Sequence, residues 1–97
     1  GVAPADLSAL ADVVATLPQL RLRGLMTLPA PSDELATQRR PFAELRELLA
    51  SLRQRHPQAP LDTLSMGMSG DLEAAVLEGA TWVRLGTAIF GQRAPRA

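Results

Sequence analysis

The sequence predicts an α/β fold in which parallel strands alternate with helices. Segments with apolar residues three and four positions apart, as in amphipathic helices, alternate along the chain with short apolar segments typical of strands. The order helix, strand, helix, strand, helix, strand, with connections of ordinary length, favours parallel strands joined by right-handed crossovers. We therefore expect one domain over residues 1–97, with about three parallel strands and intervening helices.

The first predicted helix covers residues 5–17 and the first strand covers residues 20–28. Asp6 is the expected N-cap of the helix, and Pro18 ends it because proline has no N–H to donate. The strand segment LRLRGLMTL begins with the alternation of a half-buried strand and ends at the loop that Pro29 opens. The apolar stripe of this helix consists of Leu7, Leu10, Ala11, Val14 and Leu17.

The second predicted helix covers residues 33–56, and a short strand follows at 62–65. Pro41 lies inside this helix and predicts either a kink or a new helix start there. His56 is expected to be solvated at the helix end, before Pro57. One face of this helix is apolar and consists of Phe42, Leu45, Leu48, Leu49 and Leu52.

The third predicted helix covers residues 71–78, the third strand covers 81–85, and a turn at 86–90 follows. Gly79 is expected to end this helix in the C′ position, which favours glycine. The side chains that should face inward are Leu72, Ala75 and Val76.

The charge balance argues against nucleic-acid and membrane partners. Ten basic residues stand against ten acidic ones, so no basic surface is implied. No apolar run reaches the roughly 18 residues of a membrane span, and the opening GVAPADL lacks the charged and apolar regions of a signal peptide. We expect a cytoplasmic protein with no nucleic-acid partner and no membrane contact.

Lysine and cysteine are both absent from the sequence. All ten basic residues are arginine, so no side chain of this chain can supply an amine. The absence of cysteine excludes disulfides, thiol ligands and thiol nucleophiles. The single histidine, His56, has no neighbouring partners in the sequence that would make a metal site.

The segment Ser65–Asp71, SMGMSGD, is the first candidate binding site. In parallel α/β folds, ligands gather at the C-terminal ends of strands, where this segment is predicted to lie. Gly67 and Gly70 allow the backbone to approach a ligand closely, and Ser69 is a candidate N-cap of the following helix. Exposed N–H groups there could hold a phosphate. The structural alternative is a simple strand–helix turn with a serine cap.

The segment that begins at Arg84, RLGTAIFG, is the second candidate. Arg84 lies near the end of an otherwise apolar strand, where a charge requires an anionic partner, solvent or a polar ligand. The alternative is an arginine that is ion-paired for structural reasons or that reaches solvent. Gly86 and Thr87 follow immediately, so two phosphate-type turns and an arginine are predicted at neighbouring strand ends.

These stretches resemble the pyridoxal phosphate homeostasis protein family, single-domain relatives of the barrel domain of alanine racemase. The resemblance is carried by LRLRGLMTLP and by DTLSMGMSGDLEAAVLEGATWVRLGTAIFG, and it extends over about residues 1–92. It implies a (β/α)8, or TIM-type, barrel that binds pyridoxal 5′-phosphate (PLP) at its mouth, with this chain as the C-terminal part.

The resemblance also implies roles for particular residues. Ser69 would hydrogen-bond the cofactor phosphate, and Gly86 and Thr87 would offer backbone N–H groups and the Thr87 hydroxyl to the same phosphate. Arg84 would lie beside the pyridine nitrogen, where its permanent charge disfavours protonation of that nitrogen. Met26 would stand near the site. Two further residues would line its wall: Met66 and Gly67.

This chain departs from the family in two respects. Gly70 stands where family members often carry an acidic residue, and the Schiff-base lysine, which lies on an early strand of the family's barrel, is missing. A barrel of this type has about 250 residues, so the resemblance implies a fragment without the cofactor lysine. A partial barrel exposes strand edges, and we therefore expect the fragment to self-associate.

The function implied by the resemblance is PLP binding in cofactor homeostasis, without turnover by the protein itself. One alternative is an amino-acid racemase of the alanine racemase fold. That chemistry needs a second acid or base, usually a tyrosine from another domain, and this chain contains no tyrosine. A third interpretation is an inert structural or interaction module that does not bind PLP.

Overall fold

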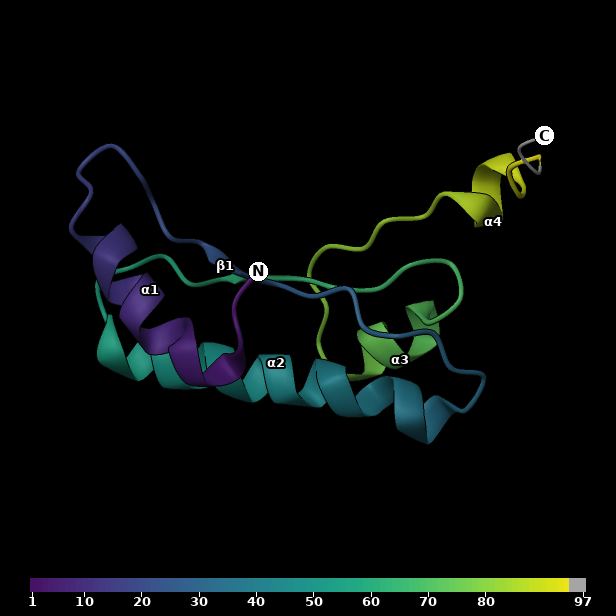
Figure 1. Ribbon diagram of the computed structural model, residues 1–97, viewed down its shortest axis with the longest axis horizontal. Helices are drawn as coiled ribbons and strands as arrows, with labels where there is room; N and C mark the ends of the chain where they lie inside the picture. The colour runs from purple at the N-terminus through teal and green to yellow at the C-terminus, as the bar shows by residue number, and fades with distance from the viewer. Residues whose placement is uncertain (95–97) are drawn as a thin grey trace.

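The computed structural model describes residues 1–94 as a small α/β arrangement built along one long helix. Figure 1 shows α2 as the base, with α1 and α3 over its two halves and the strands on the same side. None of the helices within residues 1–94 combines the length and apolar character that crossing a membrane requires. The elements in chain order are η1 (Pro4–Asp6), α1 (Leu7–Ala15), β1 (Gly24–Met26), α2 (Leu35–Arg55), β2 (Thr63–Ser65), α3 (Leu72–Leu77) and α4 (Thr87–Phe90).

The two strands pair in parallel, as the alternation of helices and strands predicts. Both are shorter than their predicted ranges. The register joins Gly24 to Thr63, Leu25 to Leu64 and Met26 to Ser65. The two strands are connected through α2, whose apolar face covers one side of the pair.

The predicted third strand over 81–85 is not a strand in the structure. The segment makes only one isolated parallel bridge, between Ser65 and Trp82. It still follows the edge of β2 through backbone hydrogen bonds: the Met66 N–H donates to the Trp82 carbonyl at 3.0 Å, and the Trp82 N–H donates to the Leu64 carbonyl at 3.2 Å. Two residues after β2, the positive φ of Gly67 ends the extended backbone, and the Gly67 carbonyl accepts the Arg84 N–H outside any ladder.

Gly24 allows the two strands to approach each other. A Cβ atom added at Gly24 would lie 1.8 Å from the Thr63 carbonyl oxygen. The N–H groups of Asp62 and Thr63 both donate to the Arg23 carbonyl at 2.9 Å, which holds the start of β2 against the start of β1. A glycine within a strand often marks such a close backbone approach.

Helix α2 is a single helix of 21 residues that does not restart at Pro41. Proline lacks the N–H that would donate to the Thr37 carbonyl, so one helical hydrogen bond is lost there. The side chains of Phe42 and Leu45, directly after Pro41, are buried and hold this part of the helix against the strands and α3. Packing of the apolar face therefore compensates for the missing hydrogen bond.

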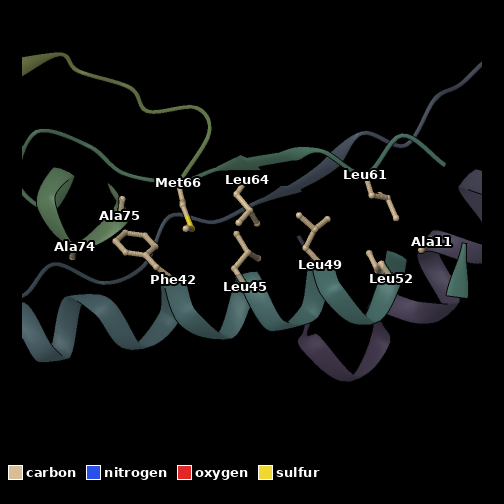
Figure 2. Packing of buried hydrophobic residues seen from close by; sticks show 10 residues of the cluster. All are labelled: Ala11, Phe42, Leu45, Leu49, Leu52, Leu61, Leu64, Met66, Ala74 and Ala75. Atoms are coloured by element: carbon tan, nitrogen blue, oxygen red, sulfur yellow. The ribbon is translucent and has the colours of Figure 1, made fainter. Parts of the chain in front are cut away.

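The hydrophobic core lies between α2, the strands and the flanking helices (Figure 2). Phe42, Leu49 and Met66 are the largest side chains that are fully buried, and Leu48, predicted on the same face of α2, is half-buried. The prediction for Val76 is wrong: it is 59% exposed, and Ala74 is buried together with Ala75. The buried hydrophobic residues are Ala11, Phe42, Leu45, Leu49, Leu52, Leu61, Leu64, Met66, Ala74 and Ala75.

A buried carboxylate fastens α3 to α2. The Glu78 side chain is only 6% exposed and accepts hydrogen bonds from Arg39 Nε at 2.9 Å and from Arg46 Nη1 at 2.6 Å. The hydrogen bond from Arg39, supported by Arg46, lowers the pKa of Glu78. Gly79 follows with φ of +95°, which confirms its predicted role at the helix end. The two arginines thus have a structural role, although both are partly exposed.

A second ion-pair cluster joins α1 to the end of α2. Arg55 donates to both carboxylate oxygens of Asp12, and His56 Nε2 lies 2.9 Å from Asp12 Oδ1. The hydrogen bond from Arg55 is the main reason that the pKa of Asp12 is lowered to about 2. His56 is half-buried in this contact and is not the solvated helix-end residue that the sequence predicts. The contact with Asp12 gives His56 a structural role at the end of α2.

Candidate functional site

The candidate site lies where β1, β2 and the segment after α3 end side by side. Met26 at the end of β1 pairs with Ser65 at the end of β2, and Ser65 bridges to Trp82. All these pairings are parallel, so the loops that follow leave from one edge. That edge carries both predicted binding segments, residues 65–71 and residues 84–91.

The loop after β2 packs tightly at its first glycine. Gly67 has φ of +108°, and an added Cβ would lie 2.7 Å from Ala75 Cβ and 3.1 Å from Val83 Cγ1. Its carbonyl accepts the Arg84 N–H at 2.9 Å, so the loop is tied to the second binding segment. Met66 is fully buried, and its side chain lies in the core beside Phe42. That Met66 lines the wall of the site, as the resemblance implies, stays a prediction.

Ser69 connects the two binding segments and does not cap α3. The residue at the N-cap position of α3 is Asp71, which makes no side-chain capping bond to this helix. Asp71 Oδ1 accepts the Met68 N–H at 2.7 Å and stabilises the loop itself. Ser69 Oγ accepts the Ala88 N–H at 3.0 Å, which brings Ser69 close to the start of α4, where Gly86 and Thr87 lie. The proximity of the two predicted turns is therefore present in the structure.

Among the described residues, Arg84 is the one whose buried side-chain donors lack hydrogen-bond partners. Its Nε and Nη2 atoms are buried and have no hydrogen-bond partner within residues 1–94. Its Nη1 atom lies 3.8 Å from the sulfur of Met26, which is a weak acceptor. Leaving buried donors of a charged group without partners is costly, so the position favours a polar or anionic group from outside the described chain.

Gly86 and Thr87 present backbone donors at the start of α4. The Gly86 carbonyl accepts the N–H groups of Ile89 and Phe90, at 3.0 and 2.8 Å. The N–H groups of Gly86 and Thr87 and the Thr87 hydroxyl form no hydrogen bond within residues 1–94. A Cβ added at Gly86 would meet no atom within 4 Å, so the backbone there is accessible. This turn can thus offer two N–H groups and a hydroxyl to an anion.

Sequence reasoning missed one residue at this edge, Gln38. Its Nε2 donates to the carbonyls of Ser32 at 2.6 Å and of Gly70 at 3.1 Å, and so joins the loops after β1 and β2. No local signal in the sequence indicates this role, because Gly70 lies 32 positions away. Gln38 lies in the first turn of α2, away from both predicted binding segments in the sequence.

The surface next to this site is hollowed. An apolar hollow of about 530 Å³ lies between the N-terminal residues, α1, β1 and α2, and Met26 is the site residue that reaches it. Throughout residues 1–94, no three histidine, aspartate or glutamate side chains are grouped as a metal site would require. The donors at the candidate edge are the N–H groups of Gly86 and Thr87, the Thr87 hydroxyl and the Arg84 guanidinium, which suit an anion.

Comparison with known proteins agrees with this geometry. The family described as "Alanine racemase, N-terminal domain" matches residues 1–94. The chain is 62% identical over 93 residues to the pyridoxal phosphate homeostasis protein of Pseudomonas aeruginosa and 50% identical to that of Escherichia coli K12. It covers 96% of its own length in both alignments but only 38% and 39% of these relatives, so it spans about two-fifths of their length.

Solved structures of PipY from Synechococcus elongatus PCC7942 have the same fold over this region. One was determined without PLP and one with PLP bound; each has a TM-score of 0.86 and 45% identity. The alignments cover 94% of this chain and 42% and 43% of the PipY chains, so the region is part of a larger fold. The two parallel strands, the match over residues 1–94 and these neighbours together show that the chain belongs to the alanine racemase N-terminal domain family.

Proposed function

We propose that this chain is the phosphate-binding end of a longer protein that binds PLP and takes part in its homeostasis without turning over a substrate. The observation that carries the proposal is Arg84, whose Nε and Nη2 atoms are buried and unpaired within residues 1–94. Such atoms call for a polar partner, and the nearby turns offer anion donors. The names of the relatives and the PLP bound to PipY support the choice of ligand.

In this proposal, different residues of the edge bind different parts of the cofactor. The N–H groups of Gly86 and Thr87, with the Thr87 hydroxyl, bind the phosphate. Ser69 Oγ accepts the Ala88 N–H, and its O–H donor and second lone pair remain available beside these groups. Arg84 faces the pyridine nitrogen and keeps it unprotonated, since a guanidinium is always charged. The backbone of Met66 and Gly67 forms the wall.

When bound, PLP supplies an electrophilic aldehyde and an aromatic ring that can withdraw electrons. A cationic neighbour that disfavours protonation of the ring nitrogen weakens that withdrawal; because PLP enzymes use arginine as well as aspartate at this nitrogen, Arg84 alone does not separate a carrier from an enzyme. This chain has no lysine, so the amine that holds the aldehyde comes from outside these 97 residues. The chain's own contribution is binding and electrostatic control.

The test uses the full-length protein loaded with PLP, reduced with borohydride and mapped by mass spectrometry. We expect one modified lysine, outside residues 1–97. Arg84→Ala should shift the absorption maximum of the bound cofactor, whereas Arg21→Ala, at an exposed arginine in the loop before β1, should not. No modified lysine would contradict PLP binding and favour an inert module. An unchanged spectrum in Arg84→Ala would contradict its place at the ring.

A racemase is the second candidate, because the matching family is described by alanine racemase. Racemisation needs two acid/base groups on opposite sides of the substrate, and this chain supplies neither a lysine nor a tyrosine. Incubation of the loaded full-length protein with amino acids in deuterated water tests this alternative. Deuterium incorporated at the α-carbon would favour the racemase; its absence, with PLP bound, would favour the carrier.

We also propose that the 97-residue chain by itself self-associates. The edge of β1 away from β2 pairs with no strand in residues 1–94, and unpaired edges invite pairing between molecules. The apolar hollow of about 530 Å³ lies along the same edge. Size-exclusion chromatography with light scattering should give a mass above 10.3 kDa. A single monomeric species would contradict this proposal.

A further inference from the structure

Gln38 connects two loops that leave the same edge of the strands. Its Nε2 atom donates to the Ser32 carbonyl in the loop after β1 and to the Gly70 carbonyl in the loop after β2. The side-chain amide has two N–H donors, so both bonds are satisfied by one nitrogen. Gln38 itself is fixed by α2, since its backbone N–H donates to the Glu34 carbonyl at 2.9 Å. A rigid helix thus holds the positions of both loops.

The loop after β2 needs this support most at Gly70. The first half of the loop is anchored by the Arg84 N–H on the Gly67 carbonyl, and Asp71 holds the Met68 N–H. Gly70 makes no other hydrogen bond within residues 1–94, and no atom lies within 4 Å of where its Cβ would be. Glycine has the most backbone freedom of any residue, so without Gln38 the Gly70 carbonyl would lose its hydrogen bond. The placement of Ser69 would then depend on the turn between Met68 and Asp71 and on the Ala88 N–H.

We propose that Gln38 is a positioning residue for the PLP phosphate: it fixes the Gly70 carbonyl and thereby the Ser69 side chain that faces the phosphate. This inference rests on the proposed function and adds a residue that does not touch the cofactor. Ser69 Oγ also accepts the Ala88 N–H at 3.0 Å, so fixing the position of Ser69 also fixes the start of α4. Supporting contacts of this kind decide whether a binding site is held to the required geometry.

The test compares Gln38→Met with Gln54→Met in the full-length protein. Methionine has nearly the shape of glutamine but no N–H donors, and neither change alters the charge. Gln54 lies on the same helix and is exposed, which makes it the matched control. Dissociation constants are measured by fluorescence titration for PLP and for pyridoxal, which lacks the phosphate. The line width of the bound phosphate is followed by phosphorus NMR.

Loss of the two hydrogen bonds that order the loop should raise the Kd for PLP about tenfold in Gln38→Met. The Kd for pyridoxal should change less than about twofold, because the phosphate contacts are those disturbed. The phosphorus line should become narrower as the phosphate gains mobility. Gln54→Met should behave as the unchanged protein in all three measurements.

The outcomes separate this inference from the proposed function. If the unchanged full-length protein binds no PLP, the proposed function itself is wrong. If it binds PLP and Gln38→Met binds equally tightly, the positioning role is wrong while the proposed function stands. Equal weakening of PLP and pyridoxal binding, with a lower thermal midpoint, would also overturn the inference, because it indicates a general loss of stability.

Discussion

The body of the molecule, residues 4–80, and its C-terminal segment, residues 81–94, are held in different ways. All the buried hydrophobic side chains belong to the body, from Ala11 to Ala75. In the segment, Trp82 is 65% exposed and Phe90 is 84% exposed, and Figure 1 shows α4 projecting away from the body. The segment is attached mainly by backbone hydrogen bonds to β2 and its loop.

This difference shows that the candidate site is shared between a packed part and a lightly attached part. Ser69 and Gly67 belong to the body, whereas Arg84, Gly86 and Thr87 belong to the segment. The exposed apolar residues of the segment have no partner surface in residues 1–94. The chain covers about two-fifths of its relatives' length, 38% in one case, which fits a segment that packs against the remaining part of a longer protein.

The largest expected effect comes from the core of the body. Phe42→Ala in the 97-residue chain should reduce the free energy of unfolding by about 3–5 kcal/mol, because it leaves a cavity at a fully buried position. The same change at the exposed Phe90 should alter it by less than about 0.5 kcal/mol. Urea unfolding followed by circular dichroism measures both. Similar losses at the two positions would remove the distinction between body and segment.

A smaller effect is expected where the body meets the segment. Gly67→Ala should lower the free energy of unfolding by about 1–3 kcal/mol, since φ of +108° disfavours alanine and its methyl group would lie 2.7 Å from Ala75 Cβ. Gly70→Ala, in the same loop with no atom within 4 Å, should change it by less than about 1 kcal/mol. If Gly70→Ala proved the more damaging change in urea unfolding, the close packing assigned to Gly67 would be wrong.

The smallest effect concerns the ion pairs that join the helices of the body. The pKa of Asp12 falls from an ordinary 3.8 to about 2 when the chain folds, chiefly through the hydrogen bond from Arg55. A lowered pKa in the folded state means that the stabilisation is complete above the ordinary pKa and is lost as the pH falls toward the folded one. Urea midpoints should therefore decrease between pH 4 and pH 2.

Asp12→Asn should flatten this pH dependence, because the neutral side chain no longer titrates. The matched control is Asp33→Asn, which removes an exposed aspartate in the loop before α2. A pH profile of Asp12→Asn that matches the unchanged chain would show that the cluster of Asp12, Arg55 and His56 does not contribute to the acid sensitivity. The C-terminal segment, which lacks aspartate and glutamate, should contribute nothing to it directly.

The body could be predicted well from local patterns. The apolar face of α2 recurs at helical spacing, and Phe42, Leu45, Leu49 and Leu52 are buried as that pattern predicts. Gly79 ends α3 because the left-handed conformation there favours glycine. The prediction for Val76 is wrong because α3 has only six residues, too few for periodicity to distinguish its sides.

The remaining features depend on partners distant in the sequence. Glu78 is buried because Arg39 and Arg46, more than 30 positions earlier, neutralise it, and helical spacing alone places both arginines in water. Ser69 stands before α3 and has the composition of a cap, yet its hydroxyl holds Ala88 in the next element. The predicted third strand has the right composition but only one bridging position beside the three-residue β2.

Position 24 accepts only glycine if the chain is to fold as described. Any side chain there would collide with the Thr63 carbonyl oxygen, because even a methyl carbon would lie 1.8 Å from it. Gly70 and Gly86 have open space around them and accept larger residues without a collision. In a randomised library selected for folding alone, position 24 should return glycine almost exclusively, while positions 70 and 86 should diversify. The close approach of the two short strands is thus a stricter constraint on folding than the open glycine positions 70 and 86 of the binding loops.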